Sequence, residues 1–341
     1  MPFRYLTSFI FLALLPLGGW LGGAWTFLAA AATPLCLASL DEALGEDKAP
    51  ADIKNEVTPR WLPRAYIVLQ LAANIWAATL VGRSGTSLIE FSGLALSAGL
   101  TTGVFGFVAA HEMIHSRDAR ERMLGLALLG SVFYMHFRIA HVYGHHRRAA
   151  TLDDPASARI GEGLYAFLAR SVTGQFREAW IFEAQRRRRT GLARIGIGNR
   201  MVVYLAIESS FLLAAALLNV RVLIFLVAVA VIAVTLLESF NYVAHYGLRR
   251  LTGPGGRTER LAPQHSWNSD RRMNNAGLFN MGRHSDHHRH MARSYERLAQ
   301  ISGSPELPSG YAAALMTALV PPLWRRVMDP RAKAVMAGSR D

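Results

Sequence analysis

The sequence predicts an all-α fold, a bundle of six transmembrane helices with a histidine-rich cap on its cytoplasmic side. Of its 341 residues 51% are hydrophobic, yet the net charge is +13. The hydrophobic residues are gathered into stretches of about 20, the length that a helix needs to cross a bilayer. All twelve histidines fall between residues 111 and 290. Together these observations are typical of a polytopic membrane protein that binds metal, and not of a soluble enzyme.

The first apolar stretch, residues 5–40, contains no Lys or Arg and is too long for a single span. Pro16 and the glycine pairs at 18–19 and 22–23 interrupt it, so we expect two short spans joined by a tight turn. Each of the other apolar stretches fits one span. The expected spans are about 5–20, 23–40, 63–82, 88–110, 201–218 and 221–240.

Two further apolar segments are not counted as spans. Met123–Ala140 carries a histidine and an arginine, and we expect it to form a buried or half-inserted helix near the metal site. Tyr311–Met328 is interrupted by the paired prolines Pro321 and Pro322 and carries Arg325 and Arg326 near its end. Because proline breaks a helix interior, an interfacial helix is a better interpretation of this segment than a seventh span.

The distribution of basic residues predicts the orientation. Six spans place both termini on one side of the membrane, together with residues 41–62, 111–200 and 241–341. Of 37 Lys and Arg residues, only Arg83 and Arg221 would lie on the opposite side. The positive-inside rule makes the crowded side cytoplasmic, in the inner membrane of a bacterial-type cell. The basic charge is therefore a topology signal, and no nucleic-acid partner is expected.

The two long cytoplasmic segments, 111–200 and 241–341, hold every histidine. We expect them to pack together beneath the spans, so that residues 1–341 form one membrane domain. Residues 41–62 begin with several acidic residues and are typical of an ordinary cytoplasmic connection.

Nine of the twelve histidines form four clusters, in the motifs HEMIH, HVYGHH, NYVAHYG and HSDHH. They are His111, His115, His141, His145, His146, His245, His284, His287 and His288. Rings four residues apart share one helix face, and adjacent rings splay by about 100°, so a doubled histidine can serve two metals. Nine imidazoles are too many for one four-coordinate ion but fit two ions with four or five each. Iron is favoured because imidazole sites with open positions suit oxygen activation.

Other interpretations of these histidines were weighed. HEMIH matches the HExxH motif of zinc proteases, in which the glutamate is the general base. That site needs only one further ligand and leaves the HVYGHH and HSDHH clusters unexplained. A metal transporter or sensor is disfavoured because every histidine clusters at one membrane face and none lies deep in a span.

Cys36 is the only cysteine and lies within the second expected span. A single cysteine excludes disulfides, zinc ribbons and cysteine-ligated iron–sulfur centres within one chain. If the metals do redox chemistry, the electrons must therefore come from another protein.

The four histidine motifs, in this order after four spans, resemble those of the integral-membrane alkane 1-monooxygenase family. Further similar stretches are LDEALGED (40–47), AATLDDPASARIGE (149–162), QHSWNS (264–269), RHSDHH (283–288) and PSGY…VMDP (308–330). The resemblance implies a six-span enzyme with a non-haem di-iron centre held by nine histidines. Such an enzyme inserts one oxygen atom from O₂ into the terminal C–H bond of an alkane or alkyl chain.

The resemblance also implies partners and alternatives. Electrons would come from a rubredoxin or ferredoxin and its NAD(P)H reductase, and the apolar substrate would enter from the lipid bilayer. Xylene-type monooxygenases and membrane fatty-acid desaturases and hydroxylases share the histidine plan. A desaturase would form an alkene without incorporating oxygen.

Residue by residue, the resemblance makes the nine clustered histidines the metal ligands. It also implies that Glu112 and Asp286, inside the motifs, accept hydrogen bonds from ligand imidazoles. Asn241 and His265 also lie in matching stretches. Asn241 could support the site, and His265 is either a residue near the site or a surface histidine.

The sequence departs from the family pattern at three positions. Ala140 and Ala244 stand where many members have glutamate directly before a ligand histidine, and Ser116 stands where a basic residue is usual. These changes remove carboxylates from the site but remove no histidine. They bear on the choice of substrate.

Three features outside the motifs have open interpretations. Arg186–Arg189 could be a membrane-facing or solvated basic surface, or a docking patch for an acidic electron carrier. The small side chains of Ala29–Thr33 could let helices pack closely, or leave a channel open for an extended chain. His136 is expected to be a buried core residue and His290 a solvated one.

Overall fold

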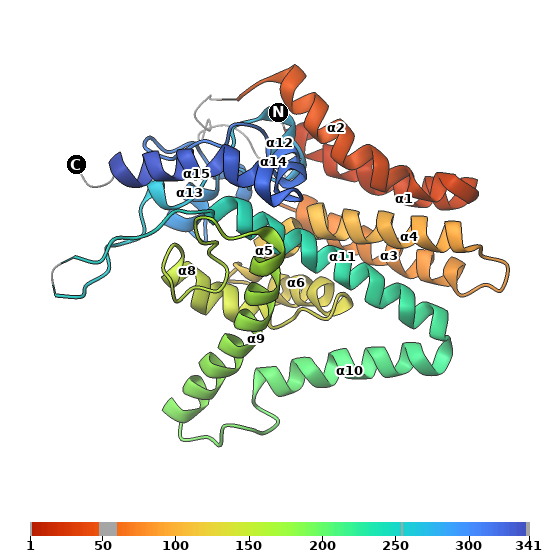
Figure 1. The fold of residues 1–341 in the computed structure, drawn as a ribbon. Coiled ribbons are helices and arrows are strands. Elements are labelled where there is room, and N and C mark those ends of the chain that lie inside the picture. The colour runs from red at the N-terminus through yellow and green to blue at the C-terminus, as the bar shows by residue number, and fades with distance from the viewer. Residues whose placement is uncertain (1, 48–59, 254, 339–341) are drawn as a thin grey trace.

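The computed structural model describes residues 2–47, 60–253 and 255–338 (Figure 1). The described residues form helices joined by loops, and their only β pairing consists of isolated bridges. The predicted all-α fold is confirmed. Most of the expected connection 41–62, residues 48–59, lies outside the described residues.

Six helical segments are long and apolar enough to cross a membrane, which confirms the predicted number. They are Arg4–Leu21, Gly23–Leu44, Leu62–Val81, Leu88–Ile114, Arg200–Leu218 and Val220–His245. The helices within them are α1 (Thr7–Leu21), α2 (Leu28–Leu44), α3 (Leu62–Val81), α4 (Leu88–Thr101), α5 (Phe107–Ile114), α10 (Arg200–Leu218) and α11 (Val220–His245). In Figure 1 the spans run in a common direction, and α12 to α15 gather at one end of them.

The remaining helices build that end of the molecule. They are α6 (Ala119–Ser131), α7 (Phe137–Ile139), α8 (His146–Arg148), α9 (Leu164–Arg189), α12 (Arg272–Gly277), α13 (His284–Arg289), α14 (Tyr311–Ala318) and α15 (Pro321–Gly338). Short 3₁₀ segments are η1 (Pro2–Leu6), η2 (Gly23–Phe27), η5 (Pro263–His265) and η6 (Tyr295–Arg297), and π-helical turns are η3 (Thr102–Gly106) and η4 (Ala140–His145).

The turn between the first two spans lies where the glycine pair predicts it. Helix α1 ends at Leu21, and Gly22 and Gly23 follow with φ of 73° and 53°. Both values lie in the left-handed region, which glycine adopts without steric cost. The chain therefore reverses without a polar loop.

The fourth span is the centre of the bundle. In its most apolar window 78% of residues are buried within the protein, against 22–33% for the other five spans. A Cβ added to Gly99 would lie 2.7 Å from the Cβ of Ile232, and one added to Gly103 would lie 2.9 Å from the Cα of Ala233. The glycines thus let α4 and η3 approach α11 closely, as small residues do in membrane helix pairs. Span four then continues through η3 into α5, which carries His111.

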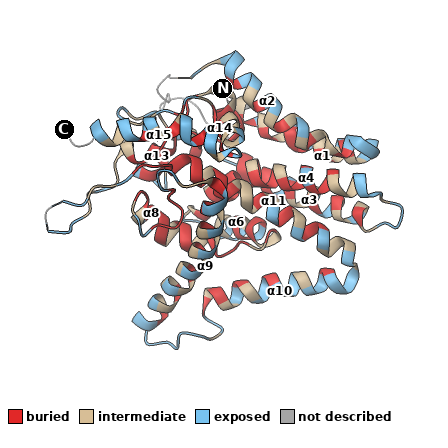
Figure 2. Cartoon of the chain, in the orientation of Figure 1, coloured by how far each residue is buried: buried red, intermediate tan, exposed pale blue. Residues whose placement is uncertain are grey.

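A buried carboxylate ties α11 to the cap. Glu238 accepts hydrogen bonds from the Tyr134 hydroxyl (3.0 Å), the Ser171 hydroxyl (2.6 Å) and the Gln175 amide (2.8 Å). A buried acidic group needs such donors because water cannot solvate it. These contacts join α11 to α9 and to the turn before α7. Figure 2 shows the buried positions concentrated around α13, α11 and the helices beside them, while the far end of α9 is exposed.

Three expectations differ from the structure. The segment Met123–Ala140 is not one helix: α6 ends at Ser131, Phe133 takes a positive φ of 56°, and a new helical run begins at Phe137. Glu208 stabilises the break by accepting from the backbone N–H of Met135 (2.8 Å). The chain from Tyr311 onward forms two helices, and the paired prolines begin the second. Proline is tolerated there because the backbone N–H groups of the first helical turn have no partner within the helix.

The third difference concerns Asp41, which was expected at the start of the cytoplasmic connection 41–62. It lies in α2, is 1% exposed and accepts from the backbone N–H of Asn274 (2.7 Å). The end of the second span is therefore joined directly to α12 of the cap.

Candidate metal centre

The structure brings all nine clustered histidines to one place, although they lie in four separate segments. His111 and His115 come from the end of α5, and His245 ends α11. The other six come from η4 with α8 (His141, His145, His146) and from α13 (His284, His287, His288). The centre lies at the end of spans four and six, where the cap packs against the bundle.

The nine rings divide into two groups, a division that the count of histidines suggests. The five-histidine group contains His111, His115, His141, His146 and His287, and the four-histidine group contains His145, His245, His284 and His288. Within each group the ring nitrogens that could bind an ion lie within 4.8 Å of one another. Sequence neighbours fall into different groups, because adjacent rings on a helix diverge by about 100°.

The Nε2 atoms point inward in both groups. In the five-histidine group, the Nε2 of His141 lies 2.7 Å from that of His111 and 3.0 Å from that of His146. In the four-histidine group, the three Nε2 atoms of His245, His284 and His288 lie 3.0–3.2 Å apart. Two nitrogens that bind one ion at about 2.1 Å and at right angles lie about 3 Å apart. The donor set and its spacing therefore fit a metal ion in each group.

Several rings are held in the neutral form that a metal ligand needs. Eight of the nine are buried, and His115 is partly exposed. Burial, reinforced by neighbouring rings, holds the pKa of His141, His287 and His288 well below the usual value. Burial lowers the pKa of His115 to about 3. At neutral pH the lone pairs of these rings are free to bind a cation.

Two rings of the four-histidine group are oriented by hydrogen bonds from their outward nitrogen, Nδ1. Nδ1 of His145 donates to Oδ2 of Asp154 (2.8 Å), which also accepts from the Ser157 hydroxyl (2.6 Å). Nδ1 of His245 donates to the carbonyl oxygen of His265 (3.2 Å). Such partners fix the tautomer, so that Nε2 presents its lone pair to the metal.

Asp154 was missed in the sequence analysis, although it belongs to the DDPASAR stretch that carries the resemblance. It is 1% exposed. Burial raises the pKa of its carboxyl, but the adjacent His145 ring outweighs that effect and the pKa lies below the usual value. Asp154 is therefore ionised. The sequence offered no signal of its own for Asp154 beyond its place in the stretch 149–162.

Glu112 and Asp286 lie beside the centre, but their described hydrogen bonds go elsewhere. Glu112 accepts from the backbone N–H of Tyr295 (3.3 Å). Asp286 accepts from Nδ1 of His290 (3.0 Å) and from the Arg293 guanidinium (2.7 Å). Both carboxylates thus hold the segment that follows α13, which lines the cavity beside His115.

Asn241, His265 and His136, which the sequence singled out, form contacts of their own in the structure. Asn241 donates to Glu238 (3.3 Å), and the ring of His265 contacts Glu259 (3.0 Å). His136 is buried against Tyr134 and Phe176 and lies in neither histidine group.

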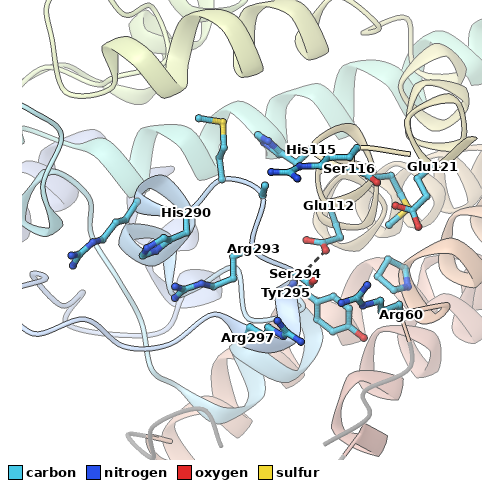
Figure 3. A pocket seen from close by; sticks show the side chains of 16 residues that line it. Arg60, Glu112, His115, Ser116, Glu121, His290, Arg293, Ser294, Tyr295 and Arg297 are labelled. Carbon is cyan, nitrogen blue, oxygen red and sulfur yellow. Dashed lines mark hydrogen bonds between the residues drawn. The ribbon is translucent and has the colours of Figure 1, made fainter. Parts of the chain in front are cut away.

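Two cavities reach the centre. An apolar cavity of about 400 Å³ is lined by residues of α2, η3 and α11, among them Thr33, Val104 and Leu237, and it touches both histidine groups through His111 and His284. A polar cavity of about 750 Å³ is lined by His115 and by Glu112, Arg293 and other charged residues (Figure 3). The centre thus has an apolar approach and a separate polar one.

Comparison with known proteins agrees with this geometry. Residues 88–317 match the fatty acid desaturase family. The chain is 41% identical to alkane 1-monooxygenase 1 of Pseudomonas aeruginosa over 313 residues, which are 88% of this chain and 81% of the relative. It is 38% identical to alkane 1-monooxygenase 2 of the same organism over 92% of this chain and 86% of the relative. The chain belongs to the alkane 1-monooxygenase family.

The predicted family resemblance is therefore confirmed, and the protein is a multi-pass membrane monooxygenase, an oxidoreductase. A more distant relative is the xylene/toluene monooxygenase hydroxylase component of Pseudomonas putida, 27% identical over 90% of this chain and 82% of the relative. Within the monooxygenase, Ala140 and Ala244 are fully buried next to His141 and His245. Asp154 places a negative charge on the same centre from a different loop.

Asp154→Asn should weaken metal binding by the four-histidine group by about 10- to 100-fold, because the amide brings no negative charge to His145. Elemental analysis of the purified protein after dialysis against a chelator measures this loss. Asp153→Asn is the matched control, since Asp153 is the exposed neighbour. Ser157→Ala disturbs the loop but leaves the carboxylate in place, so it should retain more metal. Equal metal retention by Asp154→Asn and the unaltered protein would contradict this role.

Proposed function

We propose that this chain hydroxylates the terminal C–H bond of an alkane or alkyl chain at a di-iron centre. The nine clustered histidines would hold the two irons, one in each histidine group. The observation that carries this proposal is the apolar cavity that touches both groups through His111 and His284. A hydrocarbon in that cavity would lie against both metal positions. The names of the curated relatives support the substrate class.

The overall reaction requires two electrons from outside the chain. One C–H bond and the O–O bond break, one C–O bond forms, and the second oxygen atom leaves as water after taking up two protons and two electrons. The irons, when bound, would supply the one-electron redox chemistry that activates O₂. A rubredoxin or ferredoxin, reduced by its NAD(P)H reductase, is the proposed electron donor, since Cys36 is the only cysteine of the chain.

The residues around the centre bind and orient the substrate. The apolar cavity offers Phe107, Leu237 and Leu278 as contacts for a hydrocarbon chain and leaves little polar surface to hold water. A fixed position of the terminal carbon lowers the entropic part of the barrier. Asp154 and the His265 carbonyl hold two rings of the four-histidine group, so the metal ligands are positioned before substrate arrives.

We propose that the metal centre faces the cytoplasm and that the protein lies in the inner membrane. The proposal rests on the positive-inside rule, because only Arg83 and Arg221 are expected on the other side. Residues 1–341 would form a single membrane domain, with 111–200 and 241–341 as its cap. The polar cavity beside His115 would open toward the electron carrier and the aqueous phase.

A desaturase is the main alternative, because the chain also matches the fatty acid desaturase family. The zinc protease interpretation is weaker: His111 and His115 share their group with three further histidines, which is more than that site requires.

Incubation of membranes with ¹⁸O₂, an n-alkane, NADH, rubredoxin and its reductase should yield a primary alcohol that carries ¹⁸O, because one oxygen atom enters the C–H bond. Gas chromatography with mass spectrometry detects the label. Membranes containing His284→Ala are the control. An alkene without label would establish the desaturase instead, and the absence of any product from alkanes, alkylarenes and fatty acids would count against both.

The purified protein should contain about two irons per chain, since two groups offer four and five imidazoles. His284→Ala removes a ligand of the four-histidine group and should lower the iron content, whereas His290→Ala, outside both groups, should not. Inductively coupled plasma mass spectrometry gives the stoichiometry. About one zinc per chain, unchanged in His284→Ala, would revive the protease interpretation and overturn the di-iron proposal.

Thr33→Trp should shift the preferred alkane to shorter chains by a few carbon atoms, because Thr33 lines the apolar cavity and an indole would occupy part of its length. The measurement is the product yield across a series of n-alkanes. Leu35→Trp is the matched control on the same helix, since Leu35 is 61% exposed on the outer surface. An unchanged chain-length profile in Thr33→Trp would show that the substrate does not pass this residue.

A further inference from the structure

The loop between α9 and α10, residues 190–199, exposes a group of aliphatic side chains. Leu192 is 52% exposed, Ile195 73% and Ile197 93%, and Ile197 is the most exposed large apolar side chain in the described part of the protein. Contact of such side chains with water is unfavourable. An exposed apolar patch of this kind marks a surface that binds something.

The α9–α10 loop has a defined shape, so these side chains are presented by a fixed backbone. Asn199 donates through Nδ2 to the carbonyl oxygen of Arg194 (2.6 Å). Arg186 donates to the carbonyl oxygen of Gly198 (2.9 Å). The backbone N–H of Leu192 donates to the carbonyl oxygen of Arg187 (3.0 Å). The loop is therefore held against the end of α9 at both of its ends.

The charged residues of the loop and of the chain directly before and after it are all basic. No Asp or Glu occurs between Glu183 and Glu208, whereas six arginines do. Three of the six are engaged within the protein: Arg186 pairs with Glu183 (2.6 Å), Arg187 is buried, and Arg200 donates to the Tyr143 hydroxyl (3.4 Å). Arg188, Arg189 and Arg194 remain exposed beside the aliphatic side chains.

The position of the loop is fixed by the span that follows it. Asn199 caps α10 by accepting from the backbone N–H of Met201 (2.8 Å), and α10 is one of the six candidate spans. A loop that ends at the first residue of a span must lie at the membrane surface. Figure 1 shows α9, the loop and α10 forming a corner that stands away from the other spans.

We propose that the α9–α10 loop is a membrane anchor that binds anionic phospholipids, with its three aliphatic side chains at the boundary of the acyl chains. Exposed Arg188, Arg189 and Arg194 would reach the lipid phosphates, because long basic side chains extend from an apolar surface toward the headgroups. This is the arrangement of interfacial anchors, an apolar side flanked by basic residues. The inference stands apart from the proposed hydroxylase activity.

The observations favour lipid over an acidic electron carrier at this surface. Half of the basic run that suggested a docking patch is already engaged, by Glu183 and by burial of Arg187. The aliphatic side chains lie next to the start of a span, where lipid is the neighbour available at all times.

The anchor would act on the metal centre through α9. This helix packs against η4, the turn that carries His141 and His145. Glu178 of α9 forms an ion pair with Arg148, and Phe176 contacts His136. Attachment of the far end of α9 to the membrane would hold the helix in this position.

A depth measurement with a spin label tests the anchor. Cys36→Ala removes the only cysteine, and Ile197→Cys then provides a single site for a nitroxide label on the full-length protein. The labelled protein is placed in nanodiscs of phosphatidylethanolamine and phosphatidylglycerol, and its collision rates with O₂ and with a water-soluble nickel chelate are measured. Arg257→Cys, exposed on a loop away from the spans, is the matched aqueous control.

The label at position 197 should collide more with O₂ and several-fold less with the nickel chelate than the label at position 257. Replacement of all lipid by phosphatidylcholine, or substitution of Arg188, Arg189 and Arg194 by glutamine, should raise its exposure to nickel. Equal nickel exposure at positions 197 and 257 would overturn the anchor. Shielding independent of lipid charge, or shielding that appears only when an acidic rubredoxin is added, would overturn the assignment to anionic lipid.

Discussion

Nine imidazoles gathered in one small volume are the constraint on which the rest of this structure depends. Each neutral ring has one nitrogen that donates and one that accepts, and here the Nε2 atoms face one another at 2.7–3.2 Å. Burial disfavours protonation of rings such as His141, His287 and His288, whose pKa it lowers. A cation would relieve the crowding of the inward lone pairs by sharing them. The outward nitrogens of His145 and His245 are held by Asp154 and by the carbonyl oxygen of His265.

The scaffold meets this constraint with a few buried carboxylates that join distant segments. Glu238 links α11 to α9, Asp154 links the loop after α8 to His145, and Asp41 links α2 to α12. Glu238 and Asp41 accept donors from segments far away in sequence, so the spans and the cap share their polar contacts. Loss of one of these carboxylates would leave its buried donors without a partner, which makes the bundle and the cap interdependent.

The sequence was sufficient to predict the spans and the histidines, because both signals are local. The hydropathy of about 20 consecutive residues is enough to predict a span. Two histidines four residues apart are enough to predict that their rings share one helix face. The division into five and four rings, the partner of His145 and the break at Phe133 depend on contacts between distant segments. Glu112 shows the limit of reasoning from adjacency: it follows His111 directly, yet one step along a helix turns its side chain away, toward Tyr295.

The assignment of adjacent histidines to different groups has a mechanical consequence. His145 with His146, and His287 with His288, each contribute one ring to each group. Consecutive Cα atoms are separated by about 3.8 Å, a distance set by covalent bonds. The two short helical turns that carry these pairs therefore limit the distance between the two metal positions. Because α13 carries ligands of both groups, a tilt of this helix would move ligands of both metal positions together.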